Sequence, residues 1–177
     1  PNTLINSEEP IRESVPYMQR LRDYYLALGY GNPYQWAAYS EAPFTTLTKP
    51  LAKSKIGLIT TAAPYKEGAG DQGPGAPYNA AAKFYEVYAG NTDQVDFLGI
   101  SHVGYDRKYS TAEDINSFFP LEALKRARQK GRVGELSTRY YGAPTNRSQA
   151  TTIQQDCSDL LDLVHQDGID VVLLVPN

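Results

Sequence analysis

The chain has 177 residues, of which 41% are hydrophobic, enough for one domain with a core of its own. Its net charge of −3 gives no electrostatic reason to expect a nucleic acid or an anionic membrane as partner. No apolar stretch reaches the roughly 20 residues of a membrane helix. The single cysteine, Cys157, excludes an internal disulfide and predicts a reducing, cytoplasmic environment.

The N-terminal part predicts one helix followed by an extended connection. Residues 1–15 are polar and predict a poorly ordered arm, with a single α/β domain over residues 16–177. Pro16 suits the first turn of a helix that stops at Gly29. Residues 30–54 are punctuated by prolines, and we expect their aromatic side chains to staple the connection to the domain surface. These side chains are Trp36, Tyr39 and Phe44.

Three apolar runs predict strands: residues 55–60, residues 95–101 and the run that follows Gly168. The last run is apolar at every position, which is typical of a central parallel strand with helices over both faces. In open α/β sheets the chemistry lies in the loops after such strands. We therefore expect the chain to be the front part of a longer protein whose catalytic loop comes next.

Helical patterns alternate with these strands. A short helix is expected at about residues 78–88, another from Pro120 to Gly131, and an amphipathic helix over residues 148–165. A further strand is expected near residues 133–140. The alternation predicts an α/β fold with a mostly parallel open sheet and flanking helices, a Rossmann-like or flavodoxin-like layer that is incomplete at the C-terminus.

Right-handed crossovers would bring the strand ends to one edge of the sheet. There, Thr60 and Thr61 offer hydroxyls and amides for a small anion, while His102 has Tyr105 and Asp106 close by in sequence. Such a set could bind a carboxylate or move a proton. A histidine that only hydrogen-bonds a neighbouring loop is the alternative. Further polar groups could come from Arg139, Thr145, Asn146 and Arg147.

Two other motifs have structural explanations. Residues 68–73 match G-x-G-x-x-G, but Pro74 prevents a helix from starting at the third glycine, so a mobile loop or lid is expected rather than a nucleotide site. Cys157 is expected inside a helix between Asp156 and Asp159, which disfavours a reactive thiolate. No spacing of histidines and cysteines predicts a metal site.

Several segments together point to one known family. They are 15–18, 43–51, 58–64, 100–107, 116–121, 142–146, 155–156 and 167–176, with Trp36. These segments resemble the selenoprotein B group of glycine/sarcosine/betaine reductase and D-proline reductase-like proteins. The I-S-H-x-x-Y-D-R and D-G-I-D-V-V-L-L-V-P stretches are the most specific.

The resemblance implies reductive cleavage of a C–N bond in an amino acid or related amine. It places the nucleophile just after Asn177, as a selenocysteine or cysteine followed two residues later by a second cysteine. We therefore expect truncation at an unread selenocysteine codon, with this piece alone inactive and without a cofactor. The implied partners are an amino-acid-like substrate, other reductase subunits or a thioredoxin-like electron donor, and further copies of the chain in a homo-oligomer.

Within the piece, we assign site roles from the predicted geometry. His102 would act as acid/base or orient the substrate, with Asp106 as its partner or as an amine ligand. Substrate contacts would come from Thr60, Thr61, Tyr105 and Asn146. Two other readings stay open: a racemase-like α/β enzyme for small carboxylates, and a non-catalytic binding or assembly subunit. The sequence does not choose among glycine, sarcosine, betaine and proline.

Overall fold

The computed structural model describes residues 16–29, 31, 37–64, 86–95, 98–100, 113–144 and 149–176. The chain divides into two compact units, residues 1–40 and 41–177, and each is described by itself. The first contains helix α1 (Tyr17–Ala27), which is followed by Gly29 with a φ of 83°, a left-handed conformation that suits glycine. The predicted first helix is therefore confirmed. The predicted arm over residues 1–15 lies outside the described residues, and the single domain over residues 16–177 stays a prediction.

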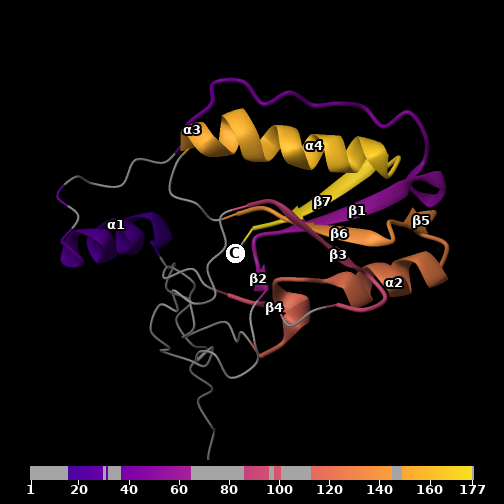
Figure 1. The fold of residues 1–177 in the computed structure, drawn as a ribbon, viewed down its shortest axis with the longest axis horizontal. Coiled ribbons are helices and arrows are strands. Elements are labelled where there is room, and N and C mark those ends of the chain that lie inside the picture. Colours follow the sequence, from indigo (N-terminus) through magenta and orange to yellow (C-terminus); the bar gives the residue numbers. More distant parts are fainter. Residues whose placement is uncertain are drawn as a thin grey trace, which may run out of the picture. The chain divides into compact units, whose positions relative to one another are not determined.

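The second unit is built on an open, mostly parallel sheet (Figure 1). Its five strands are β1 (Lys55–Thr60), β3 (Tyr88–Asn91), β5 (Glu135–Leu136), β6 (Arg139–Gly142) and β7 (Val171–Val175). Strand β1 pairs in parallel with β7 on one side, and with β5 and then β6 on the other. Strand β3 lies antiparallel outside β6. The predicted α/β class is confirmed.

Helices flank both faces of this sheet, with α4 on one side and α2 on the other in Figure 1. Helix α2 (Leu121–Gln129) follows Pro120, as predicted. The predicted helix over residues 148–165 is also confirmed, as a continuous segment with one π-helical turn. Its parts are α3 (Gln149–Thr151), the π turn (Thr152–Asp156) and α4 (Cys157–Gln166). Short 3₁₀ turns, η1 (Leu51–Lys53) and η3 (Ile115–Ser117), precede β1 and α2.

The alternation of side chains along the strands divides the core into two clusters. On the α2 side, Leu58 and Tyr140 pack with Phe119, and the Tyr140 and Phe119 rings meet edge to face with centroids 4.8 Å apart. On the α4 side, Tyr141 and Ile59 pack against the helix. The sheet is therefore buried on both faces at β1 and β6.

The predicted strand over residues 95–101 does not join this sheet. The structure forms β4 (Leu98–Gly99), which pairs antiparallel with β2 (Ala63–Pro64) in a separate two-stranded sheet. Leu98 and Ile100 are buried in the α2-side cluster, which explains the apolar pattern. The pattern reported burial correctly, but burial does not determine the pairing partner. The expected parallel pairing was wrong.

Two further expectations differ from the structure. Of the predicted helix at 78–88, residues 78–85 lie outside the described part, and Tyr88 begins strand β3. The expected aromatic staple between residues 30 and 54 is wrong for Tyr39 and Phe44, which are 73% and 94% exposed. Trp36 lies outside the described residues. The described part of this connection is extended, and the Tyr39 and Phe44 rings do not dock.

The final strand forms where predicted, but its environment is different. Among the described residues β7 pairs with β1 alone, so it is an edge strand rather than a central one. Its middle residue Leu173 is 38% exposed and Leu174 is 57% exposed. The expectation of burial on both faces was therefore wrong for the residues that the structure describes.

Candidate functional site

The carboxyl ends of three parallel strands meet at one edge of the sheet. The Ala143 N–H at the end of β6 donates to the Thr60 carbonyl over 2.8 Å, and the Thr61 N–H donates to the Val175 carbonyl of β7 over 3.4 Å. These two bonds tie the ends of β6, β1 and β7 together. Open α/β sheets bind their ligands outside the carboxyl ends of the strands, so this edge is the candidate site.

Thr60 holds the turn at the centre of the edge. Its side chain is fully buried, and its hydroxyl donates to the Phe118 carbonyl over 3.2 Å and accepts from the Ala62 N–H over 3.0 Å. Both bonds stabilise the path of the chain as it leaves β1. The neighbouring Thr61 is only partly buried. The predicted contacts of these two threonines with a substrate carboxylate stay predictions.

Tyr88 is an edge residue that the sequence reasoning missed. It begins the antiparallel strand β3 opposite Gly142, and its hydroxyl donates to the Ala62 carbonyl over 2.9 Å. A Cβ at Gly142 would overlap the Tyr88 ring, so this glycine makes room for the tyrosine. Gly90 makes room for Tyr140 in the same way. Tyrosines opposite glycines were the available signal, but their pairing was not predictable from spacing alone.

The other predicted site residues fall outside the described part of the chain. His102, Tyr105 and Asp106 lie within residues 101–112, and Asn146 lies within residues 145–148. Their placement at the edge therefore stays a prediction.

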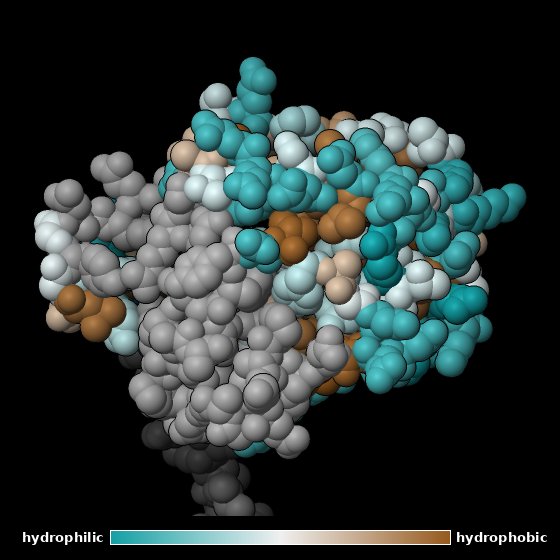
Figure 2. All heavy atoms as spheres, in the orientation of Figure 1, coloured by the Kyte–Doolittle hydropathy of each residue, from teal (hydrophilic) through white to brown (hydrophobic). Residues whose placement is uncertain are grey.

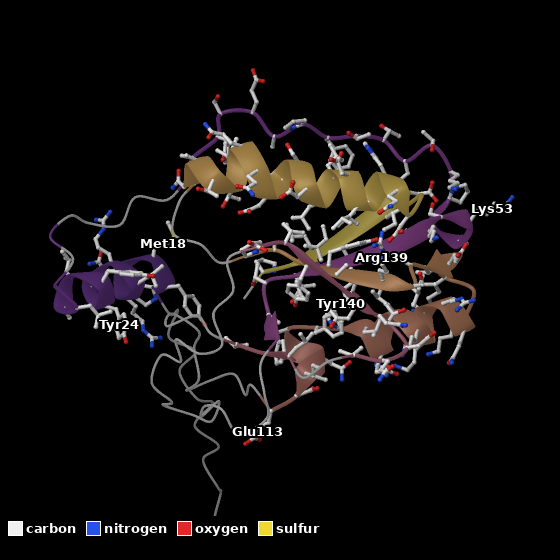
Figure 3. All side chains as sticks on the ribbon, viewed as in Figure 1. Met18, Tyr24, Lys53, Glu113, Arg139 and Tyr140 are labelled. Atoms are coloured by element: carbon white, nitrogen blue, oxygen red, sulfur yellow. The ribbon has the colours of Figure 1, made fainter. Side chains whose placement is uncertain are left out.

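A second polar cluster lies at the opposite end of β6. The Arg139 guanidinium donates to both carboxylate oxygens of Asp167 over 2.8 Å and to the Gln166 side-chain oxygen over 2.9 Å. The Tyr141 hydroxyl also donates to Asp167 and lies 3.5 Å from the Ser137 hydroxyl. In Figure 3 Arg139 lies toward the end of the sheet near Lys53. The sequence analysis offered Arg139 as a further polar group at the edge that carries Thr60. The structure instead places Arg139 with Asp167, at the opposite end of β6.

The pKa values in this cluster follow from its contacts. Hydrogen bonding to Arg139 lowers the pKa of Asp167, and the same bond raises the pKa of Arg139. Burial, with the hydrogen bond to Asp167, raises the pKa of Tyr141 to about 12. At neutral pH the cluster is a compensated ion pair with a protonated phenol. It fastens the end of α4 to β6 and has no free charge to offer a ligand.

The described residues supply little for a metal or a redox group. No group of three His, Cys, Asp or Glu side chains among them could hold a metal ion. Cys157 is exposed at the start of α4, and Asp156 beside it is buried in the π turn. No helix in the described part of the chain is long and apolar enough to cross a membrane.

A comparison with known protein families matches the part of the chain that forms the sheet, its flanking helices and the candidate edge. The family model described as "Glycine/sarcosine/betaine reductase selenoprotein B" matches residues 30–176. The chain belongs to this family. The matched range runs from the connection before β1 to the end of β7, so every strand end of the candidate edge lies within the selenoprotein B match.

The curated relatives of this chain are named as subunits of glycine reductase complexes. The protein named "Glycine reductase complex component B subunit gamma" from Symbiobacterium thermophilum is 22% identical over 147 residues, which is 82% of this chain and 33% of the relative. Its counterpart from Carboxydothermus hydrogenoformans is 24% identical over 77% of this chain and 31% of the relative. The matched part is thus about a third of the relatives' length. No solved structure matches the chain.

Proposed function

We propose that this chain is part of a reductase that cleaves a C–N bond of an amino acid or related amine, of the glycine, sarcosine, betaine or D-proline type. The observation that carries the proposal is the selenoprotein B family match over residues 30–176, which includes the carboxyl edge of a parallel sheet. The relatives' printed name, a glycine reductase complex component, supports a reductase role. It also supports other subunits of such a complex as partners.

The nucleophile in this proposal is a selenocysteine, or one of a redox-active cysteine pair, encoded after residue 177. Strand β7 delivers the chain to the edge beside Thr61, since the Thr61 N–H donates to the Val175 carbonyl. A group that follows β7 would therefore start next to the end of β1. When present, a selenol or low-pKa thiol supplies an ionised nucleophile at neutral pH, and a neighbouring thiol can resolve the bond that it forms.

This chain's own residues would bind and orient the substrate. In the proposal Thr61, which is only partly buried, contacts the substrate carboxylate, while the buried Thr60 holds the turn beside it. Tyr105 and Asn146 add polar contacts. His102 donates or accepts the proton at the amine, with Asp106 as its partner or as an amine ligand. A thioredoxin-like dithiol in the cytoplasm would return the two electrons that the cleavage consumes.

The test uses the complete gene product that carries this sequence. The purified protein, with dithiothreitol as electron source, is given glycine, sarcosine, betaine and D-proline in separate reactions, and C–N cleavage products are measured by mass spectrometry. Alkylation with iodoacetamide before the assay should abolish turnover. Cleavage of none of the four substrates, with the partner subunits added, would contradict the proposal.

A matched pair of histidine variants tests the assigned base. His102→Ala should lower kcat/KM by 10²-fold or more, the usual size of a general acid–base contribution. His165→Ala is the control, because His165 is exposed in the last turn of α4. Equal activities of the two variants would remove His102 from the reaction while leaving the reductase assignment in place.

A further inference from the structure

Within the residues that the structure describes, strand β7 presents an uncovered apolar edge. Its five residues are all valine or leucine, and in the described part of the chain it pairs with β1 on one side only. Val172, Leu173 and Leu174 are 36%, 38% and 57% exposed. Figure 2 shows hydrophobic residues gathered below α4, in the region of β7, next to hydrophilic residues on the helix.

Such an edge is unusual for a strand that faces water. Exposed edge strands normally carry charged residues, prolines or bulges that discourage pairing with another strand. Val171–Val175 has none of these, and its backbone groups on the side away from β1 find no strand among the described residues. The composition is that of a strand paired on both sides. The residues of β7 therefore suit a strand whose second edge is paired with another strand.

The path of the chain indicates on which face of the sheet a next crossover helix would lie. From β6 the chain passes through α4 and returns as β7, parallel to β6, on the far side of β1. Crossovers between parallel strands are right-handed in nearly all proteins. A next strand placed outside β7 would continue in the same direction, so its crossover helix would lie on the α4 face.

A helix in that position would cover the side chains that are now exposed. Ile59 lies in the α4-side cluster, and Leu174 is its register partner on β7, so Leu174 shares the α4 face. Val172 lies two residues earlier and shares that face. Helix α4 also leaves Leu161 52% exposed. One added strand and helix would thus bury both the free backbone edge and this apolar surface.

We propose that β7 is an interior strand of a larger sheet, and that a parallel strand with its crossover helix covers it. The occupant comes from the part of the family's subunit outside the matched region. The first relatives are about three times as long as the matched region, since the match covers 33% and 31% of them. A polypeptide of that length holds ample sequence for the missing strand and helix.

Amide hydrogen exchange tests the proposal directly. Exchange is measured by mass spectrometry on peptides covering residues 169–176, in the 177-residue chain and in the complete gene product that carries it, both at concentrations where sedimentation shows monomers. We expect β7 amides in the complete product to exchange at least 100-fold more slowly than in the chain. Equal exchange in the two proteins, or a gene product that ends at residue 177 and leaves β7 unprotected, would overturn the proposal.

A second copy of the chain is the competing occupant, and concentration separates the two. If β7 of the 177-residue chain becomes protected only as the chain dimerises, and the complete product gains no protection as a monomer, the edge belongs to a dimer interface and the proposal is wrong.

A matched pair of substitutions sharpens the result. Leu174→Glu should leave exchange in the 177-residue chain unchanged, but should raise β7 exchange in the complete product at least tenfold, because the glutamate would be buried there. Ile115→Glu is the control, since Ile115 is a 37% exposed residue of η3. This substitution should leave the exchange of the β7 amides unchanged in both proteins. Full β7 protection in the Leu174→Glu product would overturn the proposed cover on the α4 face.

Discussion

The two ends of the β1–β6 pair are stabilised by different chemistry. At the amino end of β6, Arg139 and Asp167 form a bidentate ion pair that also engages Tyr141. At the carboxyl end, the contacts are neutral: the hydroxyls of Thr60 and Tyr88 bind backbone groups. The charged end joins β6 to the end of α4, whereas the neutral end stabilises the turn that follows β1.

This difference bears on where a charged ligand can bind. An ion pair whose donors and acceptors already satisfy each other has little affinity left for a carboxylate or an amine. A neutral edge does not oppose a ligand of either sign, and its charge complement would come from the loops that follow the strands. The comparison therefore favours the carboxyl edge as the site, and substitutions at each end can test it.

The largest expected effect comes from Gly142→Ala at the carboxyl edge. The new Cβ would overlap the Tyr88 ring, which must then leave its place and lose its bond to the Ala62 carbonyl. Overpacking of this kind costs up to about 3 kcal/mol, and we expect a decrease of that size in the unfolding free energy, measured by urea denaturation.

Two further variants control this experiment. Gly31→Ala should be nearly neutral, because nothing lies within 4 Å of its Cβ position. Adding Tyr88→Ala to Gly142→Ala should cost less than the sum of the two single changes, since the clash is then gone. Strict additivity would show that the glycine and the tyrosine do not interact as described.

Next in size is the alkaline dependence of stability at the other end. Folding raises the pKa of Tyr141 from 10.0 to about 12, so the folded protein holds this proton to higher pH than the unfolded chain does. The contribution is complete below pH 10 and is lost as the pH rises to 12, a decrease of about 2–3 kcal/mol. Urea denaturation across this range measures it.

Tyr141→Phe should flatten the alkaline decrease, since the titrating group is gone. Tyr24→Phe, at a tyrosine that is 44% exposed on α1, should keep the wild-type profile. An unchanged profile in the Tyr141→Phe protein would mean that another group carries the effect.

The helices and strands of this fold were largely predictable from the sequence, whereas contacts between distant residues were not. Helical spacing and capping residues predicted α2 and the α3–α4 segment, and apolar runs predicted β1 and β7. The sequence could not assign Arg139 to Asp167, because the two are 28 positions apart and meet only through the β6–α4 packing. An ion pair between distant residues leaves no periodic signal.

The strand errors have a common physical cause. An apolar run indicates that a strand is buried in the complete fold. It does not indicate which strands pair with it. Leu98 is buried as expected, yet it lies in β4, which pairs antiparallel with β2. Leu174 is apolar as a central strand residue would be, yet it lies on an edge among the described residues. At the candidate site, the threonine positions were predictable, and the role of Tyr88 depended on the unexpected strand β3.

A smaller effect is expected from Asp167→Asn. The substitution removes the charge that binds Arg139, and we expect the unfolding free energy at pH 7 to fall by about 1–2 kcal/mol, with Arg139 partly exposed and screened by solvent. Because folding lowers the pKa of Asp167, its contribution is present above the unfolded value near 3.8 and is lost as the pH falls through the lower folded value. Denaturation from pH 7 to pH 2 measures both.

Asp162→Asn, at an exposed position of the same helix, is the matched control and should leave the acid profile unchanged. If Asp167→Asn and Asp162→Asn gave the same profile, the ion pair would contribute nothing measurable to the amino-end cluster.

The smallest effect is expected from Tyr88→Phe, which keeps the ring beside Gly142 and removes only the hydroxyl bond to Ala62. The loss of one hydrogen bond at a partly buried position should lower the unfolding free energy by about 1 kcal/mol. Tyr39→Phe, at a 73% exposed tyrosine, should change stability by less than about half that amount. Because the Ala62 carbonyl lies in the turn after Thr60, Tyr88→Phe should also raise KM more than it lowers kcat in the complete gene product. A loss confined to stability, with KM unchanged, would mean that Tyr88 supports the fold of this edge without positioning it for a substrate.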